Sequence, residues 1–394
     1  MEGIIAKEDM KVLILYLSAG TGHLKASHAL KEAFFRVLGT DSDVEVADLL
    51  EYAPSILQSV YAKGYDYTSR YAPELLDVLY QRFLEPEKEN DDTNRKLRLL
   101  WDKISTPGFL KRIKNFAPDV IVATHPDPLI LLSDLRKRKK IRAKVVGILT
   151  DYEVHSGWVH PYIDRYYVAT EEMASVLKRL KIPSRKVRAT GIPIGLDFAN
   201  PRTRSEAIIS LGLHPQKKTI FVLHGLTGRT KTASVVKELV RIKRPDLQLV
   251  VGIGKGEQVK DEVEAILKRS HMPYKLYGFI DDMVNKLAAT DLIITKPGGL
   301  IVSECLAMHV PMLLINPTPG QEEANAIFLL ERGVAMYLRN VTSLEYKLSL
   351  MLDDSSHYRR IKERLFSIGK PNASLEIAMD VVQLVSRRKV QKEV

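Results

Sequence analysis

Short apolar runs alternate with longer amphipathic stretches over most of this chain. In the first half, the runs with the composition of buried strands are Val12–Leu17, Val44–Ala47, Val120–Thr124, Val145–Leu149, Arg165–Val168 and Val187–Ala189. Helical patterns separate several of them, notably His23–Leu38, Pro128–Lys139 and Glu171–Leu180. Short apolar strands that alternate with helices predict a parallel sheet covered on both faces.

The second half repeats this pattern. Its strand candidates are Thr219–Leu223, Leu247–Val251, Lys275–Tyr277, Leu292–Ile294 and Met312–Ile315, and helices are expected at about 230–243, 256–270, 281–289, 299–309 and 322–332. The run Thr190–Phe198 lies between the halves and is expected to be a hinge. We therefore predict an α/β protein with two Rossmann-like domains that face each other across a cleft.

The expected boundaries follow from these runs. An N-terminal domain spans 1–195, a C-terminal domain spans 196–370, and a last helix with a basic tail spans 371–394. Segment 51–114 interrupts the alternation of strand and helix and predicts an inserted helical region. The length of 394 residues, 45% of them hydrophobic, is enough for a core in each half.

Two glycine-rich turns, Leu17–His23 and Lys296–Glu304, each follow an apolar run and open a predicted helix. A strand, a glycine turn and a helix leave backbone N–H groups and the positive end of the helix dipole directed at one place. In open α/β sheets, ligands bind beyond the carboxyl ends of the strands. The two turns therefore indicate a charged, phosphate-bearing ligand held between the two domains.

Composition narrows the setting of the protein. No apolar run reaches about 18 residues and the N-terminus lacks the apolar stretch of a signal peptide, so neither a spanning helix nor a secretory leader is expected. The single cysteine, Cys305, fits a reducing cytosol and is expected to pack in a core rather than act as a nucleophile. The sequence thus predicts a cytoplasmic protein.

The net charge of +11 does not by itself separate nucleic acid, anionic membrane and acidic ligand as partners. Basic residues are dense at Arg136–Lys140, and segment 51–114 combines basic residues with aromatic ones such as Trp101 and Phe109. Two explanations fit this pattern equally well. The charges lie on solvated helix faces and the aromatic residues in the core, or the segment forms a surface that touches anionic lipid headgroups. No nucleic-acid-binding motif accompanies the charge, so no nucleic-acid partner is expected.

The first glycine turn matches neither the dinucleotide fingerprint nor the P-loop, since it lacks G-x-G-x-x-G and a following Gly-Lys-Ser/Thr. Its His23 falls in the first turn of the predicted helix, where an imidazole can accept a proton from an attacking hydroxyl. The structural alternative is a histidine at the start of a helix that is bonded to a nearby carbonyl. The turn alone does not decide between them.

The second half offers several loops that follow predicted strands and could together hold a nucleotide. The backbone of His224–Thr230 could bind phosphate, Gly278–Met283 could meet a base edge, and Gly298 and Gly299 allow close approach to a diphosphate. Glu304 could accept hydrogen bonds from ribose hydroxyls, and Gly320–Asn325 suits a ligand rich in hydroxyls. One short glycine turn is weak evidence, but loops of this kind at successive strand ends are hard to dismiss.

These motifs resemble those of the inverting GT-B glycosyltransferases of family 28, in particular the monogalactosyldiacylglycerol synthases and processive diacylglycerol glucosyltransferases. The resemblance covers roughly residues 10–370, and its most specific parts are Thr295–Glu304 and Asn316–Asn325. Further matches are Thr150–Trp158, His125–Pro126 and Thr190–Pro193. One departure is Thr21, which stands between Gly20 and Gly22 where many relatives have three glycines before the histidine.

The resemblance implies a UDP-sugar donor in the second domain and a lipid acceptor in the first. The donor-binding residues that it implies are Gly225, Thr227, Phe279, Ile280, Gly298, Gly299, Leu300, Glu304, Gln321 and Glu322. On the acceptor side it implies Gly22, His125, His155 and Trp158. The expected general base is His23, and Asp151 is the second candidate, either as the base or as a partner that orients an imidazole.

A bound metal and a separate cofactor are not expected. The only Asp-x-Asp sequence, Asp41–Asp43, lies before an early strand and away from the nucleotide loops. Lys296 stands eight positions before Glu304, where retaining relatives usually have a second glutamate, so inversion is favoured. Helix N-termini and backbone amides, with Lys296 or Arg229, are expected to stabilise the leaving diphosphate.

The favoured function is transfer of glucose or galactose from a UDP-sugar to diacylglycerol, by an enzyme bound peripherally to the anionic inner face of the cell membrane. Three alternatives stay open at this point. They are transfer of N-acetylglucosamine to a polyprenyl-linked peptidoglycan precursor, epimerisation of a UDP-sugar, and a sensor that binds a UDP-sugar without turnover.

Overall fold

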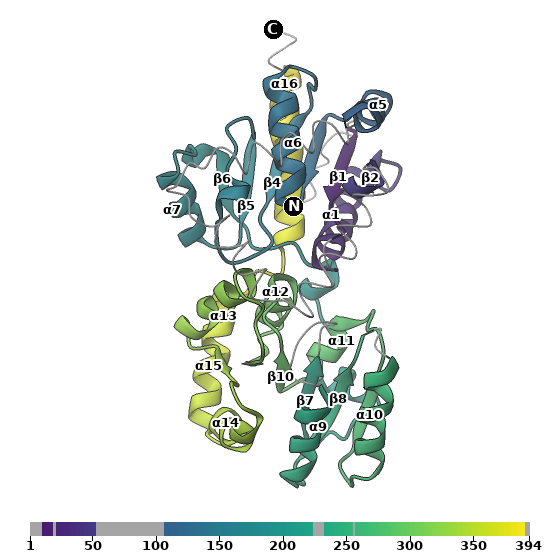
Figure 1. The fold of residues 1–394 in the computed structure, drawn as a ribbon, viewed down its shortest axis with the longest axis vertical. Helices are drawn as coiled ribbons and strands as arrows, with labels where there is room; N and C mark the ends of the chain where they lie inside the picture. Colours follow the sequence, from purple (N-terminus) through teal and green to yellow (C-terminus); the bar gives the residue numbers. More distant parts are fainter. Residues whose placement is uncertain (1–9, 19–20, 53–105, 224–231, 255–256, 391–394) are drawn as a thin grey trace. The chain divides into compact units, whose positions relative to one another are not determined.

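The computed structural model describes residues 10–18, 21–52, 106–223, 232–254 and 257–390. These residues divide into two compact units, which Figure 1 shows as ribbons. Unit 1 holds the described residues up to Leu196 and from Asn372 onward, and unit 2 holds Asp197 to Pro371. Each unit contains one six-stranded sheet whose paired strands all run parallel. The predicted α/β class is confirmed in both halves.

The sheet of unit 1 has the strand order β2-β1-β3-β4-β5-β6. Its strands are β1 (Val12–Tyr16), β2 (Val44–Asp48), β3 (Val120–Ala123), β4 (Lys144–Ile148), β5 (Arg165–Val168) and β6 (Val187–Ala189). On either side of β1, Val12 lies opposite Val44 of β2 and Val120 of β3. The chain direction across the sheet reverses between β1 and β3, and such a switch point is where open α/β sheets bind ligands.

Alternating residues of these strands pack into two separate apolar cores. Leu13 and Leu15 belong to a cluster with the helices α5 (Thr106–Phe116), α6 (Pro126–Lys137) and α7 (Glu171–Arg179). Val12 and Ile14 belong to a cluster with α1 (Gly22–Leu38) and α16 (Ala373–Val390). Because successive strand residues point to opposite faces, these two clusters lie on the two sides of the sheet.

The helix α16 completes unit 1 although it follows all of unit 2 in the chain. Its Asp380 forms an ion pair with Arg165 and accepts a hydrogen bond of 2.5 Å from the hydroxyl of Tyr167. At its first turn, the Ser374 hydroxyl donates to the carbonyl of Ile194 at 2.5 Å. The apolar face of α16 packs on α1.

The sheet of unit 2 has the order β12-β11-β10-β7-β8-β9, the arrangement of the Rossmann fold. Its strands are β7 (Lys218–Leu223), β8 (Leu247–Gly252), β9 (Tyr274–Tyr277), β10 (Leu292–Thr295), β11 (Met312–Leu314) and β12 (Ala335–Tyr337). The switch point lies between β7 and β10. Its helices are α8 (Arg204–Ser210), α9 (Thr232–Arg241), α10 (Glu257–Lys268), α11 (Met283–Ala288), α12 (Gly299–Ala307), α13 (Gln321–Glu331), α14 (Leu344–Leu352) and α15 (Ser355–Ile368).

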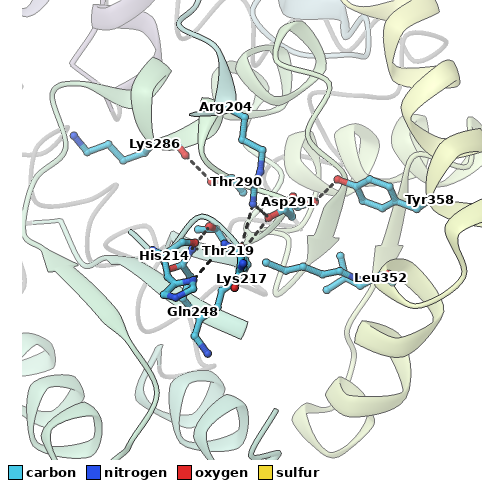
Figure 2. Close-up of polar contacts among 12 residues, drawn as sticks. Arg204, His214, Lys217, Thr219, Gln248, Lys286, Thr290, Asp291, Leu352 and Tyr358 are labelled. Atoms are coloured by element: carbon cyan, nitrogen blue, oxygen red, sulfur yellow. Dashed lines mark hydrogen bonds and ion pairs between the residues drawn. The ribbon is translucent and has the colours of Figure 1, made fainter. Parts of the chain in front are cut away.

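A polar network ties together the amino end of this second sheet (Figure 2). The carboxylate of Asp291 accepts hydrogen bonds from the backbone N–H of Thr219 at 2.7 Å and from Arg204 at 2.8 Å. The Tyr358 hydroxyl donates to the Asp291 carbonyl at 3.2 Å, and the buried Gln248 amide donates to the Thr219 hydroxyl at 3.1 Å. This network fixes β7, β8, β10 and α15 at the edge opposite the carboxyl ends of the strands, where ligands are expected.

Most predicted elements are present with ends that differ by one to three residues. The strand β12 and the helices α8, α14 and α15 were not predicted.

Of the predicted insert, 53–105 lies outside the described residues, while α5 is a helix whose Phe109 is fully buried in the core of unit 1. Among the described residues, no helix has the length and apolar character needed to cross a membrane. Short 3₁₀ turns occur at Leu49–Tyr52, Ser156–Trp158, Ser184–Lys186, Leu196–Ala199 and Val341–Ser343.

Candidate active site

Residues from neighbouring strand ends meet at the switch point of unit 1. The helix α1 begins at Gly22, just after the turn that follows β1, and His23 is its second residue. Thr124 directly follows β3, and Thr150 lies two residues beyond β4. Nδ1 of His23 lies 2.7 Å from the Thr124 carbonyl oxygen and 3.2 Å from the Thr150 hydroxyl oxygen.

These distances define the protonation of the His23 ring. A carbonyl oxygen can only accept a hydrogen bond, so Nδ1 carries the proton and Nε2 carries the lone pair. None of the residues that the structure describes forms a hydrogen bond with Nε2. Burial lowers the pKa of His23 to about 4, against a smaller opposing effect of the hydrogen bond to Thr124. The ring is therefore neutral at pH 7 and presents a basic nitrogen.

His125 stands beside this imidazole in a different tautomer. Its Nδ1 accepts a hydrogen bond of 3.2 Å from the backbone N–H of Asp127 and so caps the start of α6. The proton of the neutral ring is then on Nε2. The rings of His23 and His125 meet edge to face with centroids 4.6 Å apart. Burial and the neighbouring His23 and His155 hold the pKa of His125 well below its usual range.

The switch point of unit 2 has different chemistry. The helix α12 begins at Gly299, and its N-cap is Gly298, which has no side chain to occupy the first backbone N–H groups. Glu304, in the second turn of α12, is buried. A helix start with open N–H groups next to a strand end is a general anion-binding arrangement. The loop after β7, with Gly225, Thr227 and Arg229, lies outside the described residues, so its role stays a prediction.

An ion pair lies next to this glycine turn. Nζ of Lys296 is 3.0 Å from Oε2 of Glu322 and donates to the Thr318 hydroxyl at 2.8 Å. The backbone N–H of Thr318 donates to the same carboxylate at 2.5 Å. A Cβ placed on Gly298 would lie 4.0 Å from Oε1 of Glu322. Lys296 is 7% exposed, so its ammonium is turned toward Glu322 rather than open to a diphosphate.

The start of α13 is also held against the glycine turn. Asn325 is fully buried and its amide donates to the Pro297 carbonyl at 3.0 Å. This bond joins the two segments that the sequence singled out as most specific. Gly320 has a φ of 89°, a left-handed conformation that glycine adopts readily, and Gln321 is the first residue of α13.

Known proteins match this arrangement over nearly the whole chain. The family model of monogalactosyldiacylglycerol (MGDG) synthase matches residues 23–194, and that of the glycosyltransferase family 28 C-terminal domain matches residues 219–367. The processive diacylglycerol beta-glucosyltransferase of Bacillus cereus (strain AH187) is 30% identical over 367 residues, which are 92% of this chain and 91% of the relative. The chain belongs to glycosyltransferase family 28. The enzyme of the same name from Bacillus cytotoxicus is 28% identical over 378 residues, which are 95% of this chain and 94% of that relative.

Solved structures agree with family 28 at the level of the fold. MurG of Acinetobacter baumannii has a TM-score of 0.60 at 15% identity and covers 95% of this chain and 99% of its own. The UDP-GlcNAc 2-epimerase from Neisseria meningitidis has a TM-score of 0.58 at 15% identity and covers 95% of this chain and 100% of its own. These similarities confirm the GT-B fold, and at this identity they carry no further conclusion.

One of the expected acceptor-side roles in this family 28 chain needs correction. Trp158 is fully buried in the core of unit 1, because the turn Ser156–Trp158 folds its indole against α6. It therefore packs and does not line a binding surface. Asp151 is buried next to Thr150, while the hydrogen bonds of the His23 ring go to Thr124 and Thr150. Its role as a base, or as the partner of an imidazole, therefore stays a prediction.

For the other expected site residues, the structure gives the burial of each side chain, while their roles stay predictions. His155 is 8% exposed, and burial, with a contribution from His160, lowers the pKa of His155 to about 4. Phe279 is 48% exposed after β9, whereas the side chain of Ile280 is buried against Gly252. Only the backbone of Ile280 is then placed to meet a base. Cys305 is fully buried and burial raises the pKa of its thiol, which confirms a packing role.

Sequence patterns gave no role to three contributors to the site, namely Thr124, Thr150 and Asn325, although each lies in a run or motif singled out above. Each acts through a single hydroxyl, amide or carbonyl group, and one such contact produces no characteristic residue spacing in the sequence. Their one signal is position, because Thr124 and Thr150 follow strand ends and Asn325 closes a motif. No group of three or more His, Cys, Asp or Glu suited to a metal occurs within the described part of the chain, where Asp43 instead pairs with Lys11 at 2.9 Å.

Proposed function

We propose that this chain transfers glucose or galactose from a UDP-sugar to the free hydroxyl of diacylglycerol, with inversion at the anomeric carbon. The observation that carries this proposal is a neutral imidazole, His23, with its Nε2 lone pair unengaged by the described residues, in the unit that matches the monogalactosyldiacylglycerol synthase model. The full-length similarity to processive diacylglycerol beta-glucosyltransferases supports the choice of a lipid acceptor.

In the proposed step, the acceptor oxygen attacks the anomeric carbon from the face opposite UDP. The new C–O bond forms as the bond to the diphosphate oxygen breaks, and UDP leaves with that electron pair. Nε2 of His23 takes the hydroxyl proton, and Nδ1–H continues to donate to Thr124. General-base assistance of this kind contributes on the order of 10²–10⁴-fold to the rate. A UDP-α-sugar then gives a β-glycosyl lipid.

Unit 2 would hold the donor at its own switch point. The open start of α12 at Gly298–Leu300 suits the diphosphate, and its charge would be stabilised there by backbone N–H groups without a metal. Glu304 would accept from ribose hydroxyls, and Gln321 and Glu322 would bind the sugar. The exposed ring of Phe279 and the backbone of Ile280 would meet the uracil.

The enzyme would act as a peripheral protein on the inner face of the cell membrane. Lys137, the last residue of α6, and Lys139, Lys140 and Arg142, between α6 and β4, are exposed and would favour anionic headgroups, whereas Arg136 is paired with Asp164 at 2.8 Å. These residues precede β4 and so belong to the amino edge of the sheet, whereas His23 follows the carboxyl end of β1. They therefore add attraction to the surface without belonging to the reacting site.

The test is UDP release with UDP-glucose and with UDP-galactose, each on vesicles with and without diacylglycerol, followed by mass analysis of the lipid. Diacylglycerol-dependent UDP release together with a hexose-shifted lipid is the expected result, and it also names the donor. Tight UDP-sugar binding by vesicle-bound protein without release of UDP would overturn the proposal in favour of a sensor. Transfer only to a polyprenyl-linked acceptor would replace diacylglycerol as the substrate.

A further inference from the structure

The His23 ring is held at one nitrogen by two separate strand ends. Nδ1 lies 2.7 Å from the carbonyl oxygen that follows β3 and 3.2 Å from the hydroxyl that follows β4. We propose that Thr150 is a positioning residue, which together with the Thr124 carbonyl fixes His23 as the Nδ1–H tautomer and keeps the Nε2 lone pair available to the acceptor hydroxyl. Its catalytic meaning rests on the proposed transferase function.

The tautomer needs fixing because a neutral imidazole can carry its proton on either nitrogen. With the proton on Nε2, His23 would be unable to accept another from the attacking hydroxyl. The Thr124 carbonyl is a firm acceptor, since the Thr124 N–H donates to Leu15 at 3.0 Å and its hydroxyl lies 3.0 Å from that of the buried Ser27. The carboxyl ends of β1 and β3 and the first turns of α1 therefore hold this acceptor in place.

Thr150 adds a second acceptor that is a side chain, and so can be removed. It is 7% exposed, and because Nδ1 is the donor, its hydroxyl oxygen accepts. Two acceptors on one N–H restrict rotation of the ring. When Nε2 takes the proton, the same two bonds become charge-assisted and therefore stronger. Among the described residues, the titratable side chain in ring contact with His23 is that of His125, the neutral N-cap of α6, whose Nδ1 accepts a hydrogen bond from the backbone N–H of Asp127.

The experiment compares Thr150→Val, which keeps the branched shape and removes the hydroxyl, with Thr150→Ser, which keeps the hydroxyl. The matched control is Thr290→Val in unit 2, where an equally buried hydroxyl donates to the Lys286 carbonyl at 2.6 Å. The first readout is ¹⁵N NMR of histidine-labelled full-length protein, with the His23 signals assigned by their loss in His23→Gln. The second readout is kcat for lipid glycosylation alongside the Kd for UDP.

We expect wild-type His23 to show a protonated Nδ1 and an unprotonated Nε2, and Thr150→Val to show a second tautomer. We expect kcat to fall about tenfold in Thr150→Val, a part of the general-base contribution, with the Kd for UDP unchanged. Thr150→Ser restores both readouts, and Thr290→Val changes neither.

An unchanged His23 tautomer and kcat in folded Thr150→Val would overturn the inference. So would equal losses in Thr150→Val and Thr150→Ser, because the hydroxyl would then not be the cause. The NMR readout does not depend on turnover. Absence of lipid glycosylation by the wild type would therefore reject the proposed function while still leaving the tautomer measured.

Discussion

The switch points of the two sheets occupy equivalent places and carry opposite chemistry. In unit 1, the point between β1 and β3 gathers neutral groups, namely the His23 imidazole and the hydroxyl of Thr150. In unit 2, the point between β7 and β10 gathers an open helix start at Gly298 and the ion pair of Lys296 with Glu322. Topology therefore selects where a ligand binds, and side chains select which ligand it is.

The physical cause of this difference is the kind of group that burial acts on at each switch point. In unit 1, burial pushes imidazoles toward the neutral form, which suits proton transfer from an uncharged alcohol. In unit 2, the buried Lys296 is paired with Glu322 and the start of α12 has no side-chain cap, so its backbone N–H groups suit a diphosphate. The described residues of unit 1 thus suit the proposed uncharged acceptor, and those of unit 2 suit the proposed anionic donor.

The largest expected effect tests the chemistry assigned to unit 1. His23→Ala removes the base and should lower kcat on the order of 10²–10⁴-fold. The Kd for UDP should stay within about twofold, because the donor is assigned to unit 2. Initial-rate assays of UDP release measure kcat, and calorimetric titration with UDP measures the Kd. Equal losses of turnover and UDP affinity would remove His23 from its assigned role.

The next effect tests the ion pair of unit 2. Lys296→Met leaves the Glu322 carboxylate without its cation and should lower the free energy of unfolding by about 2–3 kcal/mol, somewhat less than for a fully buried pair because the Glu322 side chain is 25% exposed. UDP-sugar affinity should fall as well, since Glu322 lies beside Gly298. Urea unfolding and titration with UDP-sugar measure both.

The control for this prediction is the double variant Lys296→Met with Glu322→Gln. Removing both charges should recover part of the lost stability, because no unpaired carboxylate remains, while sugar-dependent affinity stays low. If the double variant were less stable than Lys296→Met by the full cost of Glu322→Gln, the two residues would be uncoupled and the pair would have no role.

A smaller effect is expected at the glycine turn. Gly298 has a φ of −66°, and a Cβ there would lie 3.9 Å from Ile301, so alanine fits without a clash. Gly298→Ala should change unfolding by less than about 1 kcal/mol, yet weaken UDP binding about tenfold by obstructing the diphosphate. Gly108→Ala in α5, with open space around its Cβ, is the matched control; it should leave UDP affinity unchanged and raise the free energy of unfolding by up to about 1 kcal/mol, because alanine is a better helix former. Unchanged UDP affinity in Gly298→Ala would place the diphosphate elsewhere.

The smallest effect concerns pH. Burial lowers the pKa of His23 to about 4, so the base is already deprotonated at pH 5.5 and kcat should change less than about twofold from pH 8 to 5.5. Below that range kcat should fall as the ring gains its proton. The unfolded chain binds this proton near pH 6.5, so the stability linked to the neutral ring declines as pH falls from 6.5 toward 4. An acid limb of kcat centred at 6.5 would contradict the buried, neutral imidazole.

The regular elements of both units could be predicted from sequence because their strands are short, apolar and separated by clear helical patterns. The strand β12 could not, since its three residues, Ala335–Tyr337, show no periodicity of their own. They are extended because they pair with β11, where Ala335 lies opposite Met312. Such a strand is specified by its neighbour in space.

The site was predictable where a motif carries it and unpredictable where a single contact does. His23 and Gly298 stand in glycine-rich turns that any reading of the chain would notice. The Thr150 hydroxyl becomes relevant only when β1, β3 and β4 are brought together by the sheet order. Trp158 shows the reverse error, because its place among candidate binding residues suggested a surface and tertiary packing put it in the core.

The return of α16 to unit 1 has a consequence for how the protein is made. A ribosome synthesises residues 12–189, which hold every strand of the first sheet, long before the helix Ala373–Val390 that covers one of its faces. Until then, Leu30, Phe34 and their apolar neighbours lack the Val381 and Val385 side chains that pack against them. Unit 2 can therefore complete its fold during synthesis before unit 1, whose last helix is made after it.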